Sequence, residues 1–320
     1  MSEKLAAIKS NLEHGIPDHS MDDLVSKQEL KLYTEGAKQG LLVAHAALHH
    51  AFKEGDPSVV SFDGDKGEKD LYISYKDKSG NPTYMPWDAK NPATDIGLRA
   101  PNPNFEGVVN PMTIIHADSE AARDFAERGA PKTVVDAVDA VARLNKFIVD
   151  EAAIPYLREV AESFEVSPDE YINIFFPENG VRARTLTRVI GYHRNAAPGQ
   201  RPVSNTDEKE LLIKEHNDKS SYTVDIEQSA RGLQYFVNRK WQDADTRITS
   251  FRGAADDYLG LKRQTPATFH RAVVGGEGEL PKEFQDAGIA RVAIPLFISP
   301  SIEGARIVEA GSSETHSSQQ

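Results

Sequence analysis

The sequence predicts an α+β chain in which a mainly helical N-terminal half packs on a β-rich C-terminal half. In residues 22–53, and again from Pro131 onwards, apolar residues recur at three- and four-residue steps, which is typical of helices with one buried face. After about residue 181 the pattern changes to short strand-like runs separated by charged or glycine-containing turns. Several such runs in succession are typical of an all-β sandwich or barrel.

The N-terminal half is expected to contain helices on both sides of an irregular segment. In the helix expected over residues 22–53, the candidate buried positions are Leu24, Leu30, Leu32, Leu41, Leu42, Ala46 and Phe52. Residues 54–115 are rich in Gly, Pro, Asp and Asn and contain one strand-like run at 71–76, so we expect turns and irregular cover there. Pro131 opens a second helix at the position that tolerates proline, and Pro155 is expected to kink or interrupt it. A capping box at residues 167–170 begins another short helix.

The C-terminal half contains the predicted strands, at residues 185–194, 210–216, 221–227, 232–238, 245–251 and 289–299. We therefore expect a helical and irregular N-terminal region at 1–175 packed on the core, a core at 176–300, and a tail at 301–320. The last residues of the tail, SSETHSSQQ, are too polar to form a core, so we expect disorder at that end.

Composition narrows the classes of partner. The 37 Lys and Arg residues are outnumbered by 49 Asp and Glu residues, a net charge of −12 that disfavours nucleic acid and anionic membrane surfaces. Cysteine is absent, which excludes disulfides, thiolate metal sites and cysteine nucleophiles. No apolar run approaches a bilayer span, and residues 1–15 lack the apolar segment of a secretory signal. We expect a cytoplasmic protein with a small-molecule substrate, and the sequence leaves the oligomeric state open.

A sparse set of metal-binding side chains lies within the predicted core. His216 and Asp218 stand two residues apart at the end of a predicted strand, so their side chains point to the same face. His270 must come from a different strand, which the facing strands of a jelly roll allow. Two imidazoles and one carboxylate are the ligand set of non-haem Fe(II) oxygenases, which leaves coordination positions open. An isolated H-x-D pair is more often a surface hydrogen bond, so its assignment as a metal site depends on the motifs that follow it in the sequence.

Those motifs occur in a recognisable order: His216-Asn217-Asp218, GLQ at 232–234, Trp241, a turn at 253–257, TFHR at 268–271, and RVAIP at 291–295. Over residues 185–300 the chain resembles the isopenicillin N synthase-like family of 2-oxoglutarate/Fe(II) oxygenases. The resemblance implies a double-stranded β-helix (jelly-roll) core with helical N-terminal cover, and Fe(II), 2-oxoglutarate and O2 as cofactor and cosubstrates. The chain departs from the family at Asn217, which is often threonine, and in the N-terminal half, which lacks the usual opening strand motif. It also departs at Ala293, where the serine of R-x-S would place a hydroxyl on the cosubstrate carboxylate.

The resemblance also implies roles for residues. His216, Asp218 and His270 would hold the metal, and no catalytic residue is expected beyond these ligands. Arg291 would bind the distal carboxylate of 2-oxoglutarate, because a guanidinium matches a carboxylate with two parallel hydrogen bonds. Tyr192 could add a hydroxyl there, and a packed core tyrosine is the alternative.

The substrate-binding candidates are Arg184, Arg188 and Arg194, which share one face if residues 185–194 form a strand, and Phe297, which stands at a position that often lines the family's substrate pocket. The arginines suggest an anionic or amino-acid-like substrate. The alternatives are a solvated face paired with nearby acids for the arginines, and ordinary core packing for Phe297.

The implied activity is oxidation of a small-molecule metabolite by hydroxylation, desaturation or cyclisation, with release of succinate and CO2. A 2-oxoglutarate-independent iron oxidase of the same fold and a non-catalytic metal-binding jelly roll remain open as alternatives. A second histidine group, His45, His49 and His50, has helical spacing but lacks the glutamate of H-E-x-x-H, so we interpret it as part of an amphipathic helix. No nucleotide-binding glycine loop and no G-x-S-x-G nucleophile elbow occur.

Overall fold

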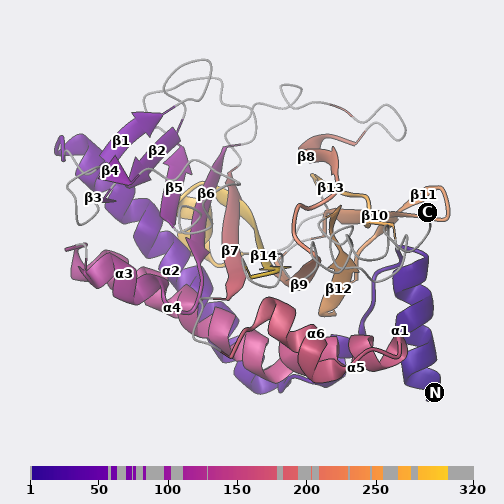
Figure 1. Cartoon of the computed structure of the whole chain (residues 1–320). Helices are drawn as coiled ribbons and strands as arrows, with labels where there is room; N and C mark the ends of the chain where they lie inside the picture. The colour runs from indigo at the N-terminus through magenta and orange to yellow at the C-terminus, as the bar shows by residue number, and fades with distance from the viewer. Residues whose placement is uncertain are drawn as a thin grey trace, which may run out of the picture.

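The computed structural model places two β-sheets against each other and a layer of helices across the larger one (Figure 1). The structure describes residues 2–56, 59–62, 70–73, 75–76, 82–83, 97–101, 111–127, 129–178, 183–193, 203, 209–229, 231–245, 247–254, 266–274 and 280–301, with only the backbone between 59 and 83. The predicted tail at 301–320 therefore lies outside the described residues except for Ser301, and Arg194 lies outside them as well.

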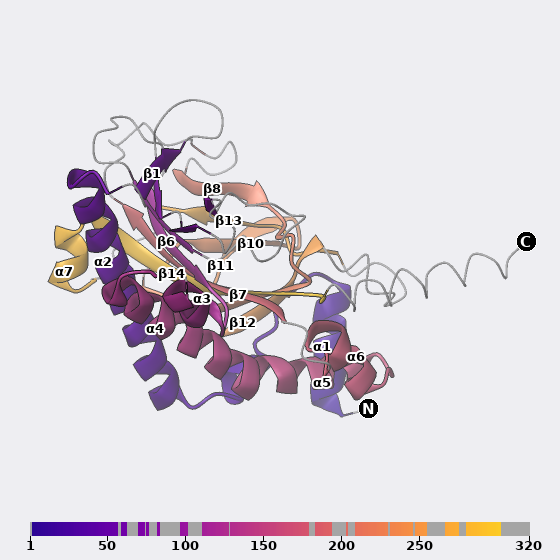
Figure 2. The ribbon, with the colours of Figure 1, turned by 60° about the vertical axis from the view of Figure 1, so that its left-hand side comes forward.

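The helices gather in the N-terminal half and pack on one face of the large sheet (Figure 2). The longer ones are α1 (Glu3–Glu13), α2 (Lys27–Lys53), α4 (Lys132–Ile148), α5 (Ile154–Ser163) and α6 (Pro168–Phe175). Shorter ones are a 3₁₀ turn (Ser20–Asp23), α3 (Ala121–Glu127) and α7 (Lys282–Asp286). Helices α2 and α4 lie against each other and against strands of the sheet, so they form the layer behind the site.

The helix boundaries follow local chemistry. Helix α2 begins after Ser26, whose hydroxyl accepts a hydrogen bond from the Glu29 amide, and α6 begins after Ser167 in the same way, as its capping box predicts. Pro155 does interrupt the predicted helix: a π-helical turn (Val149–Ala153) stands directly before it. A widened turn relieves the clash between a proline ring and the preceding carbonyl groups, which a regular α-helix would suffer.

The buried face of α2 differs in part from the prediction. Leu41 is buried as expected, but Leu32 is 71% exposed and Ala46 is also exposed. The stripe that faces the core instead consists of Thr34, Ala37, Lys38, Gly40, Leu41, Ala44 and Leu48. Small residues dominate this stripe because α2 packs closely against α4, and hydrophobicity alone does not reveal that requirement.

The strands form two main antiparallel sheets. The large sheet has the order β1 (Val59–Phe62), β2 (Asp70–Ile73), β5 (Gly97–Pro101), β6 (Met112–Ala117), β7 (Arg184–His193), β14 (Ile289–Ser299), β9 (Tyr222–Gln228) and β12 (Thr249–Arg252). The small sheet has the order β11 (Lys240–Asp243), β10 (Leu233–Val237), β13 (His270–Val273) and β8 (Leu211–His216). A separate ribbon pairs β3 (Tyr75–Lys76) with β4 (Pro82–Thr83).

This arrangement confirms the predicted α+β class and the double-stranded β-helix core. Strands β7, β14, β9 and β12 face β8, β13, β10 and β11, so chain segments far apart in sequence lie opposite one another (Figure 1). Each predicted strand run contains a strand; most ends shift by one residue, but the run at 245–251 is β12 and begins only at Thr249, and β11 and β13 were not among the predicted runs. The expectation of irregular cover at residues 54–115 is wrong, because β1, β2, β5 and β6 extend the large sheet there. These strands are short, so the Gly, Pro, Asp and Asn residues outside them dominate the composition of the region.

The core lies mainly between the large sheet and the helices. Asn145 on α4 is fully buried and bridges to β7, where its amide nitrogen donates to Thr187 Oγ1 at 3.1 Å and its oxygen accepts from Thr185 Oγ1 at 3.3 Å. A second, smaller cluster between the sheets consists of Ile114, Ile190, Tyr192, Leu212, Ala272 and Ala293. Strands β7 and β14 are therefore fixed from behind by the helical layer, and their other face is available to build a site.

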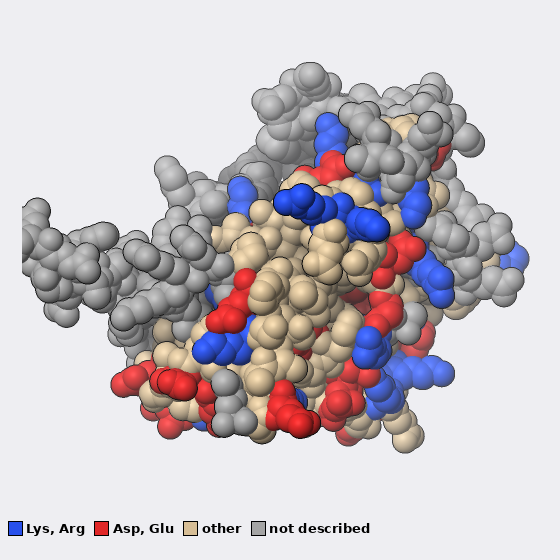
Figure 3. Space-filling model, turned by 90° about the vertical axis from the view of Figure 1, so that its right-hand side faces the viewer, with Lys and Arg blue, Asp and Glu red and all other residues tan. Residues whose placement is uncertain are grey.

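The described surface is mixed in charge. On the face seen in Figure 3, acidic and basic side chains are interspersed around an uncharged centre. Among the helices that the structure describes, none is both long and apolar enough to cross a membrane.

Candidate metal centre and its pocket

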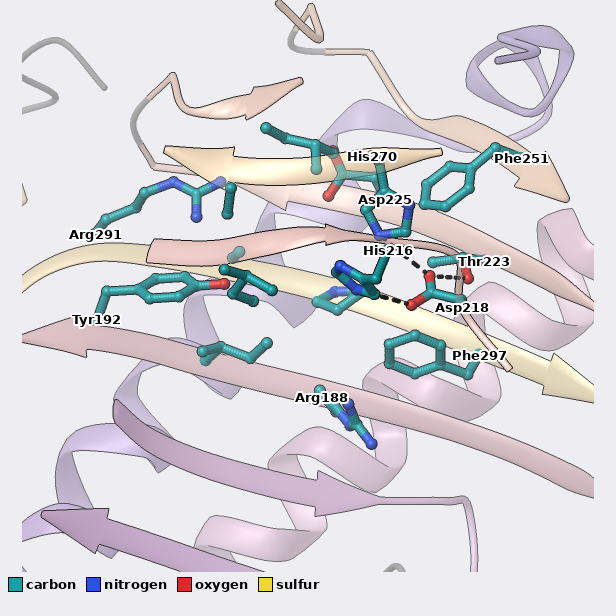
Figure 4. A pocket seen from close by; sticks show the side chains of 16 residues that line it. Arg188, Tyr192, His216, Asp218, Thr223, Asp225, Phe251, His270, Arg291 and Phe297 are labelled. Carbon is teal, nitrogen blue, oxygen red and sulfur yellow. Dashed lines mark hydrogen bonds and ion pairs between the residues drawn. The ribbon is translucent and has the colours of Figure 1, made fainter. Parts of the chain in front are cut away.

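His216, Asp218 and His270 meet at one point between the two sheets (Figure 4). His216 ends β8, Asp218 lies in the turn that follows, and His270 begins β13, directly opposite His216 in the antiparallel register. The candidate ligand atoms all lie within 4.8 Å of one another. The two Nε2 atoms stand 3.5 and 3.6 Å from the Asp218 carboxylate oxygens. Among the described residues, this is the one group of His, Asp and Glu side chains with such convergence.

Backbone carbonyls fix the orientation of both imidazole rings. His216 Nδ1 lies 2.7 Å from the Lys214 carbonyl oxygen, and His270 Nδ1 lies 3.1 Å from the Thr268 carbonyl oxygen. A carbonyl only accepts hydrogen bonds, so each Nδ1 carries the proton and each Nε2 presents its lone pair to the centre. Metal-binding histidines are commonly oriented in this way.

In the metal-free state, the site favours a charged His216, a charged Asp218 and a neutral His270. The hydrogen bond with Asp218 raises the pKa of His216 above its usual value, although burial opposes this. Burial alone would raise the pKa of Asp218, but hydrogen bonds from His216 and Thr223 and the charge of His270 hold it below the usual value. Burial lowers the pKa of His270, so its neutral, metal-binding form is favoured.

The turn that carries Asp218 is held by hydrogen bonds from β9 and from residues 253–254, and by the close packing of Gly253. Thr223 on β9 donates a hydrogen bond from Oγ1 to Asp218 Oδ2 at 2.6 Å. Gly253 packs so closely on the turn that an added Cβ would lie 2.0 Å from the Ser220 carbonyl oxygen. The amides of Gly253 and Ala254 also donate to the carbonyls of Ser221 and Asp218, at 2.9 and 2.7 Å. The glycine noted in the sequence at the start of the 253–257 turn is therefore required by close backbone packing.

Other motifs of the ordered set meet behind His270. Arg271 is fully buried, donates from Nε to Gln234 Oε1 at 2.8 Å, and stacks over the Trp241 ring at 4.0 Å. Gln234 in turn donates to Asp243 at 2.7 Å. These residues join β10, β11 and β13, so the GLQ, tryptophan and HR elements form one structural unit under the metal ligands.

A pocket with about 580 Å³ of space free of protein atoms surrounds the triad. One wall comes from β14, where alternate side chains point inward. Its lining residues on that strand are Arg291, Ala293, Pro295 and Phe297. At roughly 3.3 Å per strand residue, Arg291 and Phe297 stand about 20 Å apart, with the triad between them in Figure 4. The site therefore has two distinct ends.

Arg291 and Tyr192 mark the first end. Arg291 is 4% exposed, and its guanidinium lies 4.9 Å from the centre of the Tyr192 ring. Its Nη2 donates to Gln228 Oε1 at 2.8 Å. Burial raises the pKa of the Tyr192 hydroxyl, while a hydrogen bond with Arg291 and its charge oppose that rise. Both residues predicted for cosubstrate binding therefore lie together in the pocket, next to the small side chain of Ala293.

Arg188 and Phe297 mark the second end, where the Arg188 guanidinium lies 4.7 Å from the Phe297 ring centre. The strand register places His116 on β6 opposite Arg188. Burial and the charges of Arg188 and Arg99 hold the pKa of His116 well below its usual value. Arg184 begins β7 opposite Ser299 and does not line the pocket.

The histidines of α2 form no metal site. His45 and His193 both hydrogen-bond to Thr113 Oγ1, at 2.9 and 2.8 Å, while His49 contacts the Pro101 carbonyl at 3.0 Å. Burial lowers the pKa of His45 to about 3 and that of His193 to about 4. These rings join α2 to the sheet as neutral hydrogen-bonding groups. They are more buried than we predicted for histidines of an amphipathic helix.

Two pocket residues, Thr223 and Asp225, escaped the sequence analysis, as did Gln228, which binds Arg291, and Arg99 and His116, which lie near Arg188 but outside the pocket lining. Thr223 and Asp225 share the inward face of β9 with the same two-residue spacing that identified His216 and Asp218. That spacing was visible in the sequence, but which of the two faces of the strand points inward was not.

Comparisons with known proteins agree with this architecture. No protein-family model matches the chain, and no curated protein matches it. Among solved structures, a full-length Neurospora crassa protein in complex with α-ketoglutarate (2-oxoglutarate) matches with a TM-score of 0.52 at 14% identity, over 94% of this chain and 82% of that chain. The rice dioxygenase for auxin oxidation matches with a TM-score of 0.48 at 14% identity, over 94% and 79%. A 2OG-Fe(II) oxygenase family protein from Caulobacter crescentus matches with a TM-score of 0.46 at 13% identity, over 95% and 87%.

At this level of identity the likeness to the Neurospora crassa protein concerns the fold, and it extends over nearly the whole chain. The chain has a double-stranded β-helix fold with helices on its large sheet, and in this fold it is similar to the Neurospora crassa protein.

Proposed function

We propose that this chain is an Fe(II)- and 2-oxoglutarate-dependent oxygenase that oxidises a small anionic metabolite. The observation that carries the proposal is the convergence of His216, Asp218 and His270 in a pocket that also contains the buried Arg291. Two imidazoles and one carboxylate suit Fe(II), and they leave room for further ligands. The solved Neurospora crassa neighbour contains α-ketoglutarate, which agrees with this assignment.

The protein's own contribution to the metal would be a preformed ligand set. The two Nε2 atoms already face the centre because their Nδ1 atoms are hydrogen-bonded to carbonyls, and Thr223 fixes the carboxylate of Asp218. When bound, Fe(II) would supply the redox chemistry that couples reduction of O2 to oxidation of 2-oxoglutarate and substrate, with succinate and CO2 as by-products.

Arg291 and Tyr192 would bind the distal carboxylate of 2-oxoglutarate. A buried guanidinium attracts a carboxylate strongly because little water screens the two charges. Tyr192 remains a hydroxyl at neutral pH, since burial raises its pKa, and it can donate a hydrogen bond to the same carboxylate. Ala293, two residues from Arg291 on β14, adds no hydroxyl group to this end of the pocket.

Arg188 and Phe297 would bind the substrate at the opposite end. The apolar ring offers a packing surface, and the charges of Arg188 and Arg99 favour a carboxylate or another anionic group. The reaction outcome, whether hydroxylation, desaturation or cyclisation, depends on which C–H bond this end holds next to the metal.

The test is the loss of metal binding and turnover in single-ligand variants. We expect His216→Ala, Asp218→Ala and His270→Ala each to weaken Co(II) binding, measured by visible absorbance, and to abolish Fe(II)-dependent succinate formation from 2-oxoglutarate. His50→Ala serves as the control, because His50 is an exposed histidine on α2 outside the pocket. The proposal fails if any ligand variant keeps full activity.

A further inference from the structure

A second carboxyl group lies inside the pocket, at the end assigned to the cosubstrate. Asp225 is on the inward face of β9 and is 5% exposed. Its carboxyl group stands between Arg291 and His270 in the view of Figure 4. The cosubstrate also carries its distal carboxylate towards Arg291, so two carboxyl groups would share one small buried space.

Gln228 connects Asp225 to Arg291. The amide nitrogen of Gln228 donates to Asp225 Oδ2 at 2.6 Å, and its oxygen accepts from Arg291 Nη2 at 2.8 Å. The Leu233 amide also donates to that oxygen, at 3.3 Å, which fixes the orientation of the Gln228 side chain. Asp225 is therefore held at the guanidinium by a chain of hydrogen bonds.

Asp225 also lies beside the position that lacks a hydroxyl. Strand β9 pairs with β14 so that Gln228 faces Ala293 and Asp225 faces Pro295. The side chain of Asp225 therefore lies across from Pro295, one inward-facing position along β14 from Ala293, and all three residues line the pocket. A protonated carboxyl at this point offers an O–H group close to where a serine at 293 would offer one.

The surroundings favour the neutral form of Asp225. Burial raises its pKa to about 6, while Gln228 and Arg291 oppose the rise and Asp245 and Glu227 add to it. The other titratable groups around it are Tyr192 on β7, Tyr235 on β10 and His270 on β13. A second carboxylate in the same buried site would raise the pKa of Asp225 further, as in other carboxylate pairs.

Resting on the proposed function, we infer that Asp225 takes up one proton from solvent when 2-oxoglutarate binds, and donates a hydrogen bond to its distal carboxylate beside Arg291. The proton resides on Oδ1, because Oδ2 accepts the hydrogen bond from Gln228. Asp225 is thus a positioning residue for the cosubstrate, and it makes recognition of a dicarboxylic 2-oxo acid dependent on pH.

The experiment is calorimetric titration of the Fe(II)-loaded full-length chain under anaerobic conditions at pH 6, 7 and 8, in buffers of different ionisation enthalpy. Two ligands are compared: 2-oxoglutarate, and 2-oxobutyrate, which has the same metal-chelating end but no distal carboxylate. Their affinity ratio cancels titration of the metal ligands themselves. The wild type should lose about tenfold in this ratio for each pH unit above 6, with uptake approaching one proton at pH 8.

Asp225→Asn is the informative variant, because an amide keeps a hydrogen-bond donor but cannot titrate. Its affinity ratio should be independent of pH, and it should bind 2-oxoglutarate more tightly than the wild type at pH 8. Asp245→Asn is the matched control, since this half-exposed carboxylate lies outside the pocket; its loss should lower the pKa of Asp225 slightly, but the affinity ratio should still fall with pH at the wild-type slope.

The inference is overturned if the wild type binds 2-oxoglutarate with a constant affinity ratio and no proton uptake between pH 6 and 8. It is also overturned if 2-oxobutyrate binds as tightly as 2-oxoglutarate at pH 6. The distal carboxylate would then gain nothing from Arg291, as expected if Asp225 stays ionised and neutralises that guanidinium. The wild-type data decide both points even if the Asn variant does not fold. Failure of both 2-oxo acids to bind at every pH would instead refute the proposed function itself.

Discussion

Gly253→Ala should damage the metal centre through backbone packing alone. The added Cβ would lie 2.0 Å from the Ser220 carbonyl oxygen and 3.0 Å from the Asp218 carbonyl oxygen. Contacts under 3.0 Å essentially never occur, so the Ser220 carbonyl must retreat by about 1 Å (3.0 minus 2.0 Å). Both atoms belong to the turn that carries Asp218, and the Asp218 carbonyl is also bound to the Ala254 amide at 2.7 Å.

The expected size of the effect follows from this displacement. Overpacking a tight contact costs about 1–3 kcal/mol of unfolding free energy. A shifted metal ligand or support typically loses about 10–100-fold in metal affinity. Denaturant unfolding and Co(II) titration would measure the two effects on the same preparation.

Gly36→Ala provides the matched control. Gly36 lies inside α2, and no atom lies within 4 Å of the position of its added Cβ. Alanine should therefore stabilise the helix by about 0.5–1 kcal/mol and leave metal affinity unchanged. If Gly253→Ala binds Co(II) and unfolds like the wild type, the turn is not held by close packing and this account of Asp218 is wrong.

Three further predictions concern the surroundings of the site. Thr223→Val removes the hydrogen bond to Asp218 and should weaken Co(II) binding by about tenfold, whereas Thr223→Ser, which keeps the hydroxyl, should bind normally. Asn145→Leu leaves the buried Thr185 and Thr187 hydroxyls without their amide partner, so denaturant unfolding should show a loss of about 1–3 kcal/mol with metal affinity unchanged. Metal affinity should fall as pH drops through the raised pKa of His216, above the usual 6.5, because the proton competes for Nε2; a pH series that is flat between 8 and 6 would contradict this. In the metal-free protein the sign is opposite: the raised pKa means that protonated His216 stabilises the fold below about 6.5, and this contribution disappears at higher pH.

Most strands and the metal ligands of the C-terminal half could be predicted because residues close together in the sequence identify them. Alternating apolar residues predicted most strands between 185 and 299, although not β11 and β13, and the two-residue spacing of His216 and Asp218 places them on one face without any knowledge of the sheet. Arg291 and Phe297 were identified from their place in an ordered set of motifs. In the structure, they lie at opposite ends of one pocket wall.

The remaining features depend on contacts between distant segments. Strands β1, β2, β5 and β6 are stabilised by pairing into an existing sheet, so their own short sequences carry little periodic signal. Asp225 is a carboxylate in a strand, and its burial beside Arg291 becomes apparent only once β9 is paired with β14. The same holds for His116, which the register of β6 on β7 places opposite Arg188, and for Arg99, which lies on the next strand, β5.

The most direct test of the central claim is an anaerobic titration of the Fe(II)-loaded protein with 2-oxoglutarate, followed by visible absorbance, in the wild type and Arg291→Ala. Arg247→Ala is the control, because this exposed arginine pairs with Asp245 and lies outside the pocket. A charge-transfer band that saturates in the wild type and the control, and needs at least about tenfold more 2-oxoglutarate in Arg291→Ala, is the result that we predict. If Fe(II) binds to the wild type and no band develops, the pocket does not bind 2-oxoglutarate at the metal, and the account is contradicted.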